Sequence, residues 1–171
     1  AMDDVIISAA TGTASTGETG SGSESAQTAI AASVGSTTGL NIPKLAKAKE
    51  TFDLASVDPS IPRHIIVSPE QINNLLNVTE VTSSDFNTVK ALVQGEIDTF
   101  LGFKFTVSNR LAKSGNDRTC IAFAQDGITL AIGKDVNARI DERADKSYAT
   151  QVYYCMSIGA TRMEQAKVLG I

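Results

Sequence analysis

The chain has 171 residues, with 15 Lys and Arg against 19 Asp and Glu, which gives a formal charge of −4. This length allows one domain, or one domain with an appendage, and 42% hydrophobic with 20% charged residues is the composition of a globular protein. The slight acidic excess argues against a nucleic-acid-binding protein, because such proteins hold phosphates through clustered Lys and Arg. No apolar run approaches the roughly 20 residues of a membrane-spanning helix.

The N-terminal part of the chain differs in composition from the rest. Residues 1–43 contain no Lys or Arg, and 25 of the 30 residues at 10–39 are Gly, Ser, Thr or Ala. A segment whose larger apolar residues are only Ile30 and Val34 buries too little surface to offset the entropy of ordering itself. We therefore expect residues 5–10 to be the end of a helix or strand, followed by a long flexible loop or arm.

Periodic patterns begin at residue 40. Asn41 followed by Pro43 is a typical helix start, and the apolar residues after it recur at helical spacing: Ile42, Leu45, Ala48 and Phe52. Residues 63–67 end in three consecutive apolar side chains, which predicts a buried, central strand. Residues 68–71 read Ser-Pro-Glu-Gln, a capping box that opens a second helix. A third helix is expected at residues 84–95.

Beyond residue 95 the period changes to two. Apolar residues alternate along 101–107, which predicts a half-buried strand. A polar turn at 113–118 precedes a strand at 119–124, and another long strand is expected at 149–158. Residues 126–132 fit either a strand or one to two turns of helix. Helices followed by strands define the α+β class.

Few residues suit catalysis. Cys120 and Cys155 lie inside apolar runs, which predicts buried free thiols and no disulfide. The single histidine, His64, stands at the start of a predicted strand with no nucleophile at a readable spacing, so we interpret it as structural. We assign no catalytic, cofactor-binding or metal-binding residue and do not expect an enzyme.

Charged residues alternate in sign along 137–146. One alternative is a small hydrolase that would hold a divalent metal with Asp126, Asp141 and Glu142. Basic residues are interleaved with these carboxylates, however, which favours a salt-bridge ladder that is solvated or lies between subunits. The candidate intersubunit contacts are therefore Arg139, Asp141, Glu142, Arg143, Asp145 and Lys146.

Several segments share their order with a known family. Residues 63–71 read Arg-His-Ile-Ile-Val-Ser-Pro-Glu-Gln and precede a Leu-Leu pair, and residues 101–108 read Leu-Gly-Phe-Lys-Phe-Thr-Val-Ser. The first resembles the strand, Ser-Pro and helix segment in the axial domain of the major capsid proteins of tailed phages, and the second a strand of that family. Residues 126–143 and 153–171, which include Gly-Ala-Thr-Arg, resemble the terminal strands that return to the peripheral domain.

This resemblance implies the Hong Kong 97-type capsid fold, with an axial domain and part of a peripheral domain. It divides the chain into the end of the spine segment and a Gly/Ser/Thr-rich loop at 1–39, the axial domain at 40–135, and the terminal strands of the peripheral domain at 136–171. The family's N-terminal arm, its extended hairpin loop and most of its spine helix have no counterpart in the sequence. We therefore expect a C-terminal fragment, monomeric on its own.

The function implied is that of a structural head subunit of a tailed phage or prophage, which self-assembles into an icosahedral shell enclosing the DNA. The implied partners are copies of itself in pentamers and hexamers, together with a scaffolding protein. No specific nucleic-acid binding, membrane or cofactor is expected, and the protein would be made in the bacterial cytoplasm and reside in the virion capsid. A second alternative is a phage head-completion or tail module that uses the Gly/Ser/Thr arm to fold onto a partner.

Overall fold

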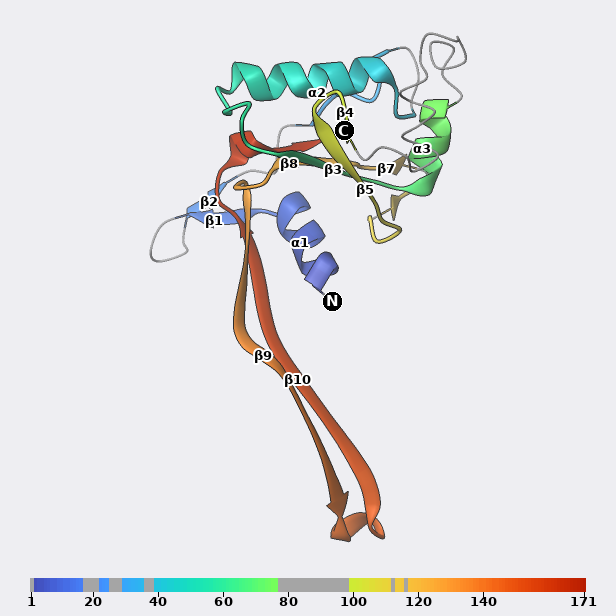
Figure 1. The fold of residues 1–171 in the computed structure, drawn as a ribbon, viewed down its shortest axis with the longest axis vertical. Coiled ribbons are helices and arrows are strands. Elements are labelled where there is room, and N and C mark those ends of the chain that lie inside the picture. Colours follow the sequence, from blue (N-terminus) through green and yellow to red (C-terminus); the bar gives the residue numbers. More distant parts are fainter. Residues whose placement is uncertain are drawn as a thin grey trace.

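The computed structural model describes residues 2–16, 22–24, 29–35, 39–76, 99–111, 113–115 and 117–171. A compact body carries one long β-hairpin that extends away from it (Figure 1). The helix expected at residues 84–95 lies outside the described part of the chain. Among the helices that are described, none has the length and apolar character needed to cross a membrane.

The body is built on a five-stranded mixed sheet. Its strand order is β11 (Val168–Gly170), β8 (Ile121–Ala124), β3 (Arg63–Val67), β5 (Phe103–Val107) and β4 (Thr99–Phe100). The central strand β3 is parallel to β5 and antiparallel to β8. The prediction of a central strand at 63–67 is therefore confirmed, and its apolar side chains pack on both faces of the sheet, as expected for a strand covered on two sides.

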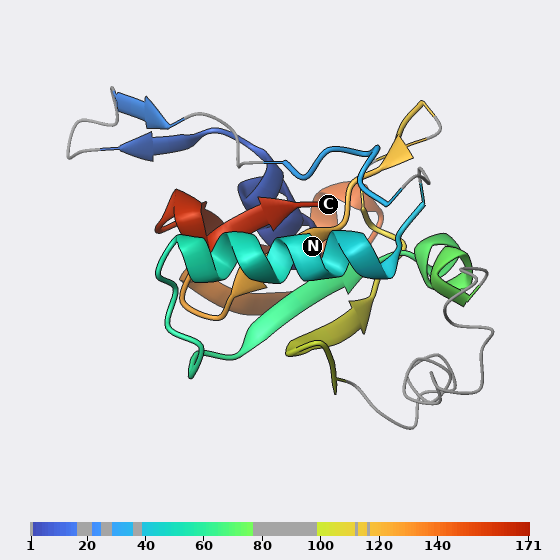
Figure 2. The same cartoon turned by 90° about the horizontal axis from the view of Figure 1, so that it is seen from above.

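Helix α2 (Ile42–Leu54) covers one face of this sheet (Figure 2). The Asn41 side chain accepts a hydrogen bond of 2.9 Å from the backbone N–H of Lys44, so the predicted helix start is confirmed. The inward side of α2 is fully buried, and Phe52 packs on Phe103 of β5 with ring centres 6.0 Å apart. Because the buried residues recur every three to four positions, the helix presents one apolar stripe to the sheet.

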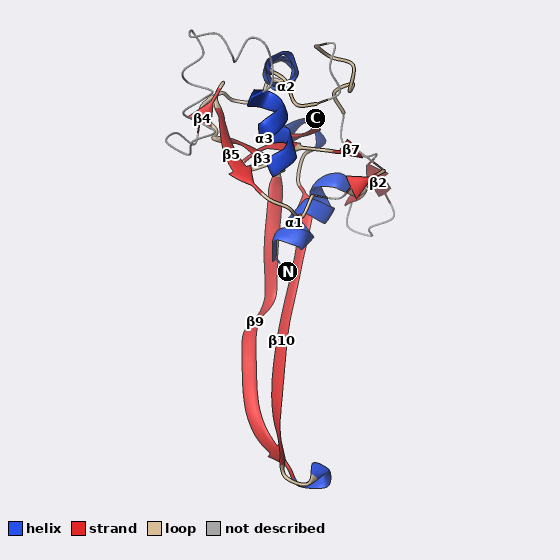
Figure 3. Cartoon of the chain, turned by 90° about the vertical axis from the view of Figure 1, so that its right-hand side faces the viewer, coloured by secondary structure: helices blue, strands red, loops and turns tan. Residues whose placement is uncertain are grey.

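Helix α1 (Met2–Thr11) lies on the opposite face of the sheet (Figure 3). Its Ile7 and Ala10 are buried against Ile121 of β8 and Val168 of β11. The exposed side of α1 is tied to the body by an ion pair from Arg110 to Asp4, which lowers the pKa of that carboxyl group. The body therefore has three layers: helix, sheet, helix.

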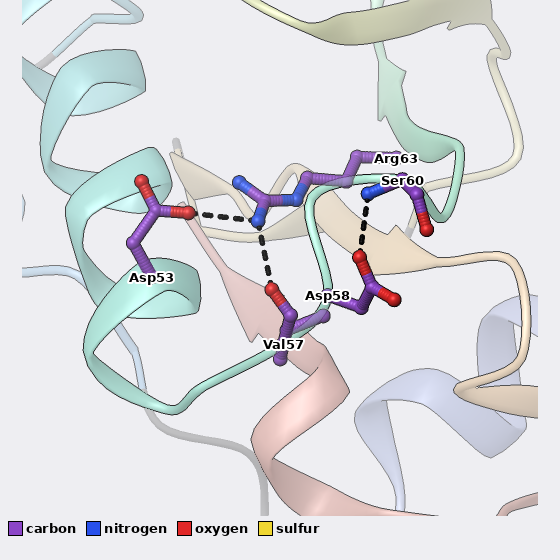
Figure 4. Close-up of polar contacts among 5 residues, drawn as sticks. All are labelled: Asp53, Val57, Asp58, Ser60 and Arg63. Atoms are coloured by element: carbon purple, nitrogen blue, oxygen red, sulfur yellow. Dashed lines mark hydrogen bonds and ion pairs between the residues drawn. The ribbon is translucent and has the colours of Figure 1, made fainter.

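An arginine fastens the connection between α2 and β3 (Figure 4). Nη2 of Arg63 donates to the Asp53 carboxylate at 2.8 Å and to the Val57 carbonyl at 3.2 Å. Its guanidinium carbon lies 5.4 Å from the centre of the Phe52 ring. Asp58 accepts a bond of 2.8 Å from the Ser60 N–H in the same loop, which lowers the pKa of that carboxyl group. The two bonds of Arg63 Nη2 offset part of the cost of burying a cation that is only 6% exposed, whereas its buried Nε has no hydrogen-bond partner among the described residues.

Helix α3 (Pro69–Leu76) follows β3 directly. The Gln71 side chain accepts from the Ser68 N–H at 2.9 Å and donates to the Arg118 carbonyl at 2.6 Å. The glutamine half of the predicted capping box is thus present. The serine half is not, because the buried Ser68 hydroxyl has no hydrogen-bond partner among the residues described.

Two sequence predictions need correction. The strand expected at 101–107 is a hairpin of β4 and β5, since Leu101 and Gly102 form a turn with φ of 52° and 85°. Part of the segment predicted to be flexible pairs as β1 (Ala14–Thr16) with β2 (Gly22–Glu24), because backbone hydrogen bonds can form a strand pair without apolar side chains. For residues 126–132 the sequence left a strand and helical turns open, and the structure places residues 128–132 in strand β9 (Ile128–Arg143). The predicted polar turn at 113–118 is confirmed as the hairpin of β6 (Lys113–Ser114) with β7 (Asp117–Arg118).

Candidate interaction surface

The hairpin consists of β9 (Ile128–Arg143) and β10 (Ala149–Arg162), paired antiparallel along their whole length. At about 3.4 Å per residue, 16 residues of β9 span roughly 50 Å. The register shifts on either side of Ser157, where β9 carries extra residues. The two strands form a sheet of their own, separate from the sheet of the body. The boundary expected between residues 135 and 136 falls within β9.

The base of the hairpin is fixed to the body by polar contacts. Nζ of Lys167 donates to Asp126 at 2.7 Å and lies 2.9 Å from Glu164, and these two carboxylates raise its pKa to about 12. The Met163 N–H donates to the Gly127 carbonyl at 3.0 Å. A Cβ at Gly127 would lie 2.9 Å from the backbone oxygen of Lys167, so this close approach of two backbones requires glycine.

The two faces of the distal hairpin differ in chemistry. Successive side chains of a strand point to opposite faces, and cross-strand partners share a face. One face, which we call the charged face, carries residues 137, 139, 141 and 143 of β9 with Gln151 and Tyr153 of β10. The other, the apolar face, carries Ala138 and Ile140 of β9 with Val152 and Tyr154 of β10, and it ends towards the tip at Glu142, which lies opposite Thr150. Neither is covered: Ile140 is 72% exposed and Val152 is 69% exposed.

The apolar face continues an interface that exists at the base. Along β10, Arg162 is buried and Ala160, Ile158 and Met156 are half-buried, whereas Tyr154 on the same side is exposed. Ile128, the cross-strand partner of Arg162, packs against the cluster that holds α1. The N-terminal end of α1 points along the hairpin towards its tip (Figure 1). The side that α1 covers at the base is therefore uncovered farther out.

The tip is a tight turn. It contains a 3₁₀ turn (Ala144–Lys146) followed by Ser147 and Tyr148, both in the left-handed region at φ of 52° and 58°. Nε of Arg143 donates to Asp145 at 2.8 Å within this turn, and the bond lowers the pKa of the Asp145 carboxyl group. Left-handed backbone is costly for residues with a side chain, so the sequence holds this turn through the ion pair and the flanking ladder.

The six predicted contact residues all lie at the distal end of the hairpin and are exposed: Arg139, Asp141, Glu142, Arg143, Asp145 and Lys146. The structure pairs Arg143 with Asp145. Sequence reasoning missed Ile140, Val152 and Tyr154. The available signal was the apolar side chain that alternates with charge inside the 137–146 segment, but a period-two pattern does not reveal whether a strand has a second layer against it.

The carboxylates of the alternative metal site are separated. Asp126 pairs with Lys167 at the base of the hairpin, whereas Asp141 and Glu142 lie near its tip. Fifteen residues of extended strand place them on the order of 50 Å apart. The structure therefore contradicts the three-residue site, and the described residues contain no group of three or more metal-binding side chains.

His64 and Cys120 are packed side chains of the body. The His64 ring stacks on Phe123 with centres 5.6 Å apart, and burial, with a smaller effect of Lys104, lowers its pKa. Cys120 is fully buried, which raises its pKa to about 12, so this thiol is unreactive at neutral pH. Cys155 lies on β10 and is only half-buried, which corrects the prediction for that residue.

One cavity of about 330 Å³ opens in the body between α2, α3 and the end of the chain. The charged side chains that line it have partners: Nζ of the buried Lys44 donates to the Gly39 carbonyl at 2.8 Å, and Nε of Arg118 lies 3.7 Å from Glu70. Burial lowers the pKa of Lys44. These contacts are those of a packed wall, and they bring no nucleophile next to a base.

Several solved structures share this architecture. A structure from Mycobacterium phage Che8 matches with a TM-score of 0.68 and 18% identity over 98% of this chain and 54% of that one. The capsid of cyanophage P-SCSP1u matches with a TM-score of 0.65 and 16% identity, over 98% of this chain and 58% of that one. A capsid of an empty GTA particle gives 0.53, at 12% identity over 84% of this chain and 53% of that one. The fold is therefore a partial Hong Kong 97-type capsid fold.

The sequence supports the same assignment at the level of family. A family model described as phage capsid protein matches residues 1–171, and the chain belongs to this family. No curated protein sequence matches it. The chain spans a little over half the length of the phage structures that it resembles.

Proposed function

We propose that this chain is part of the major capsid subunit of a tailed phage or prophage, a structural protein that self-assembles into an icosahedral shell enclosing the DNA. The observation that carries the proposal is a hairpin of roughly 50 Å with two uncovered faces. Exposed apolar patches on soluble proteins mark contact sites. A closed shell supplies such contacts, because every subunit meets several copies of itself.

The two faces of the hairpin suit different neighbours. The apolar face extends the interface with α1, so we assign its cover to the spine helix that the family carries before this region. The charged face is left for copies of the subunit, in pentamers, hexamers and the contacts between them. On this basis we assign residues 1–39 to the end of the spine segment and its loop, 40–135 to the axial domain and 136–171 to the peripheral domain.

The proposal has further parts. The intact subunit would be made in the bacterial cytoplasm, assemble there with a scaffolding protein and remain in the virion capsid. We assign it no reaction and no specific nucleic-acid or membrane partner. The 171-residue chain by itself is expected to be largely monomeric when no cross-link holds two copies together, since it holds only part of the contacts of a subunit.

Charge reversal on the hairpin tests the proposal. Arg139→Glu with Arg143→Glu in the intact capsid protein should prevent ordered shells, as judged by negative-stain microscopy, while circular dichroism stays unchanged because both side chains are exposed. The matched control, Arg139→Lys with Arg143→Lys, keeps the positive charges and should form shells. Normal particles from the reversed protein would contradict the role of this surface. Rings or tubes from the unaltered protein would instead indicate a head-completion or tail module.

A further inference from the structure

The outer edge of β9 has no strand beside it among the described residues. In the sheet of the hairpin, β9 has one neighbour, β10. In every second residue of 137–143 the backbone N–H and C=O groups therefore point away from β10. Figures 1 and 3 show that the distal part of the hairpin stands clear of the body. A free edge of this length is a template for pairing with another strand.

The charges on this strand are not balanced inside the hairpin. Arg139 lies opposite Tyr153, and Asp141 lies opposite Gln151. Neither side chain forms an ion pair with another residue of the described chain. Both belong to the charged face, two residues apart on the same strand, so their order can match a strand that runs in the opposite direction.

Among two-fold axes through residues 139, 140 and 141, charge favours one register for two copies of β9. In antiparallel pairing about a two-fold axis through Ile140, Arg139 of each copy lies opposite Asp141 of the other. The same register places Asn137 opposite Arg143 and sets the two Ile140 side chains side by side. An axis through residue 139 would place Arg139 opposite itself, and an axis through residue 141 would place Asp141 opposite itself. Like charges directly opposite one another destabilise a strand pair.

We propose that β9 pairs with β9 of a second copy, antiparallel and about a two-fold axis through Ile140, so that two hairpins form one four-stranded ribbon. The contact is isologous, with the same residues contributed by both copies. It rests on the proposed function in that a shell subunit meets copies of itself, and it names which residues meet.

Cysteine cross-linking tests the pairing in the 171-residue chain. Ile140→Cys, in a Cys155→Ser background, should give a disulfide-linked dimer under mild oxidation, because directly opposite residues of antiparallel strands have Cα atoms about 4.5–5.5 Å apart. The matched control is Val152→Cys. Val152 is nearly as exposed as Ile140 and lies directly opposite it on β10, on the same face of the hairpin. In the ribbon two such residues are three strand spacings apart, roughly 14 Å, which is too far for a disulfide. Buried Cys120 remains in both proteins.

Charge exchange tests the register. In the Ile140→Cys protein, Arg139→Asp or Asp141→Arg alone should reduce the yield of dimer several-fold, since each places like charges opposite one another. The two substitutions together restore opposite charges and should return the yield to its starting value. The pairing would be overturned if the Val152→Cys control gave as much dimer as the Ile140→Cys protein. It would also be overturned if the charge substitutions left the yield of dimer unchanged.

The same readout separates this inference from the proposed function. Particles assembled from the intact protein with Ile140→Cys and Cys155→Ser should contain the 140–140 dimer on a denaturing gel. Closed shells without that dimer would overturn the pairing and leave the capsid function standing. The opposite outcome is a cross-linked dimer of the 171-residue chain together with an intact protein that forms no shell. It would support the pairing and count against the capsid function.

Discussion

The body and the hairpin use similar strands in opposite ways. In the body, Ile65 and Phe103 lie on strands covered by helices and are fully buried, whereas Ile140 and Val152 lie on equally regular strands and are more than two-thirds exposed. Backbone pairing is therefore enough to form a strand, but burial of its side chains needs a second layer. The body supplies that layer from its own helices, and the distal hairpin has no such layer among the described residues.

Removal of one large side chain from each region should give the largest difference. Phe52→Ala should lower the free energy of unfolding by about 3–5 kcal/mol, because it leaves a cavity beneath α2. Ile140→Ala should change it by less than about 0.5 kcal/mol in the same chain, because the site is exposed. Urea unfolding followed by circular dichroism compares the two. Equal losses would mean that the hairpin is packed in solution.

Loss of the buried arginine should destabilise the body next. Arg63→Leu should cost about 1–3 kcal/mol, since it removes the bond to the buried Val57 carbonyl together with the ion pair. Asp53→Asn is the control and should cost less than about 1 kcal/mol, because that carboxylate is half exposed. Urea midpoints of the two variants would show the order. A larger effect of the Asp53 change would contradict it.

A methyl group at the base of the hairpin should act on both regions. Gly127→Ala places a Cβ against the Lys167 backbone, and relief of this overpacking should cost about 1–3 kcal/mol. Gly159→Ala has open space around its Cβ and should lie within about 0.5 kcal/mol of the unaltered chain. Thermal unfolding of both variants provides the measurement. If Gly127→Ala behaved like Gly159→Ala, the base of the hairpin would be less tightly joined to the body than the structure indicates.

The ion pairs of Lys167 should have the smallest effect, and the pH dependence of this effect should be visible only at high pH. Its folded pKa of about 12 exceeds the ordinary value of 10.5, so the pairs stabilise the folded chain fully below pH 10.5. This contribution is lost as the pH rises through about 12. The melting temperature should therefore fall less steeply over this range in Lys167→Gln than in the unaltered chain, and identical slopes would contradict the role of these pairs.

The sequence was most informative where local chemistry decides structure. The helix capped by Asn41, the central strand at 63–67 and the Gln71 half of the capping box followed from side chains within a few residues of one another. It was least informative at Leu101 and Gly102, where alternation continued through a turn. The six charged contact residues lie together at the exposed distal end of the hairpin, and their role between copies stays a prediction.

Local sequence thus determined which residues form strands and helices, because capping, turn chemistry and the period of apolar residues act over a few positions. Tertiary structure alone decided which strands receive cover. It buried β3 between two helices, placed Asp126 far from Asp141, and left Ile140 and Tyr154 uncovered on the hairpin. The physical reason is that the same alternating pattern occurs in strands that their own chain covers and in strands that it leaves uncovered. Only the spatial arrangement of the layers distinguishes the two.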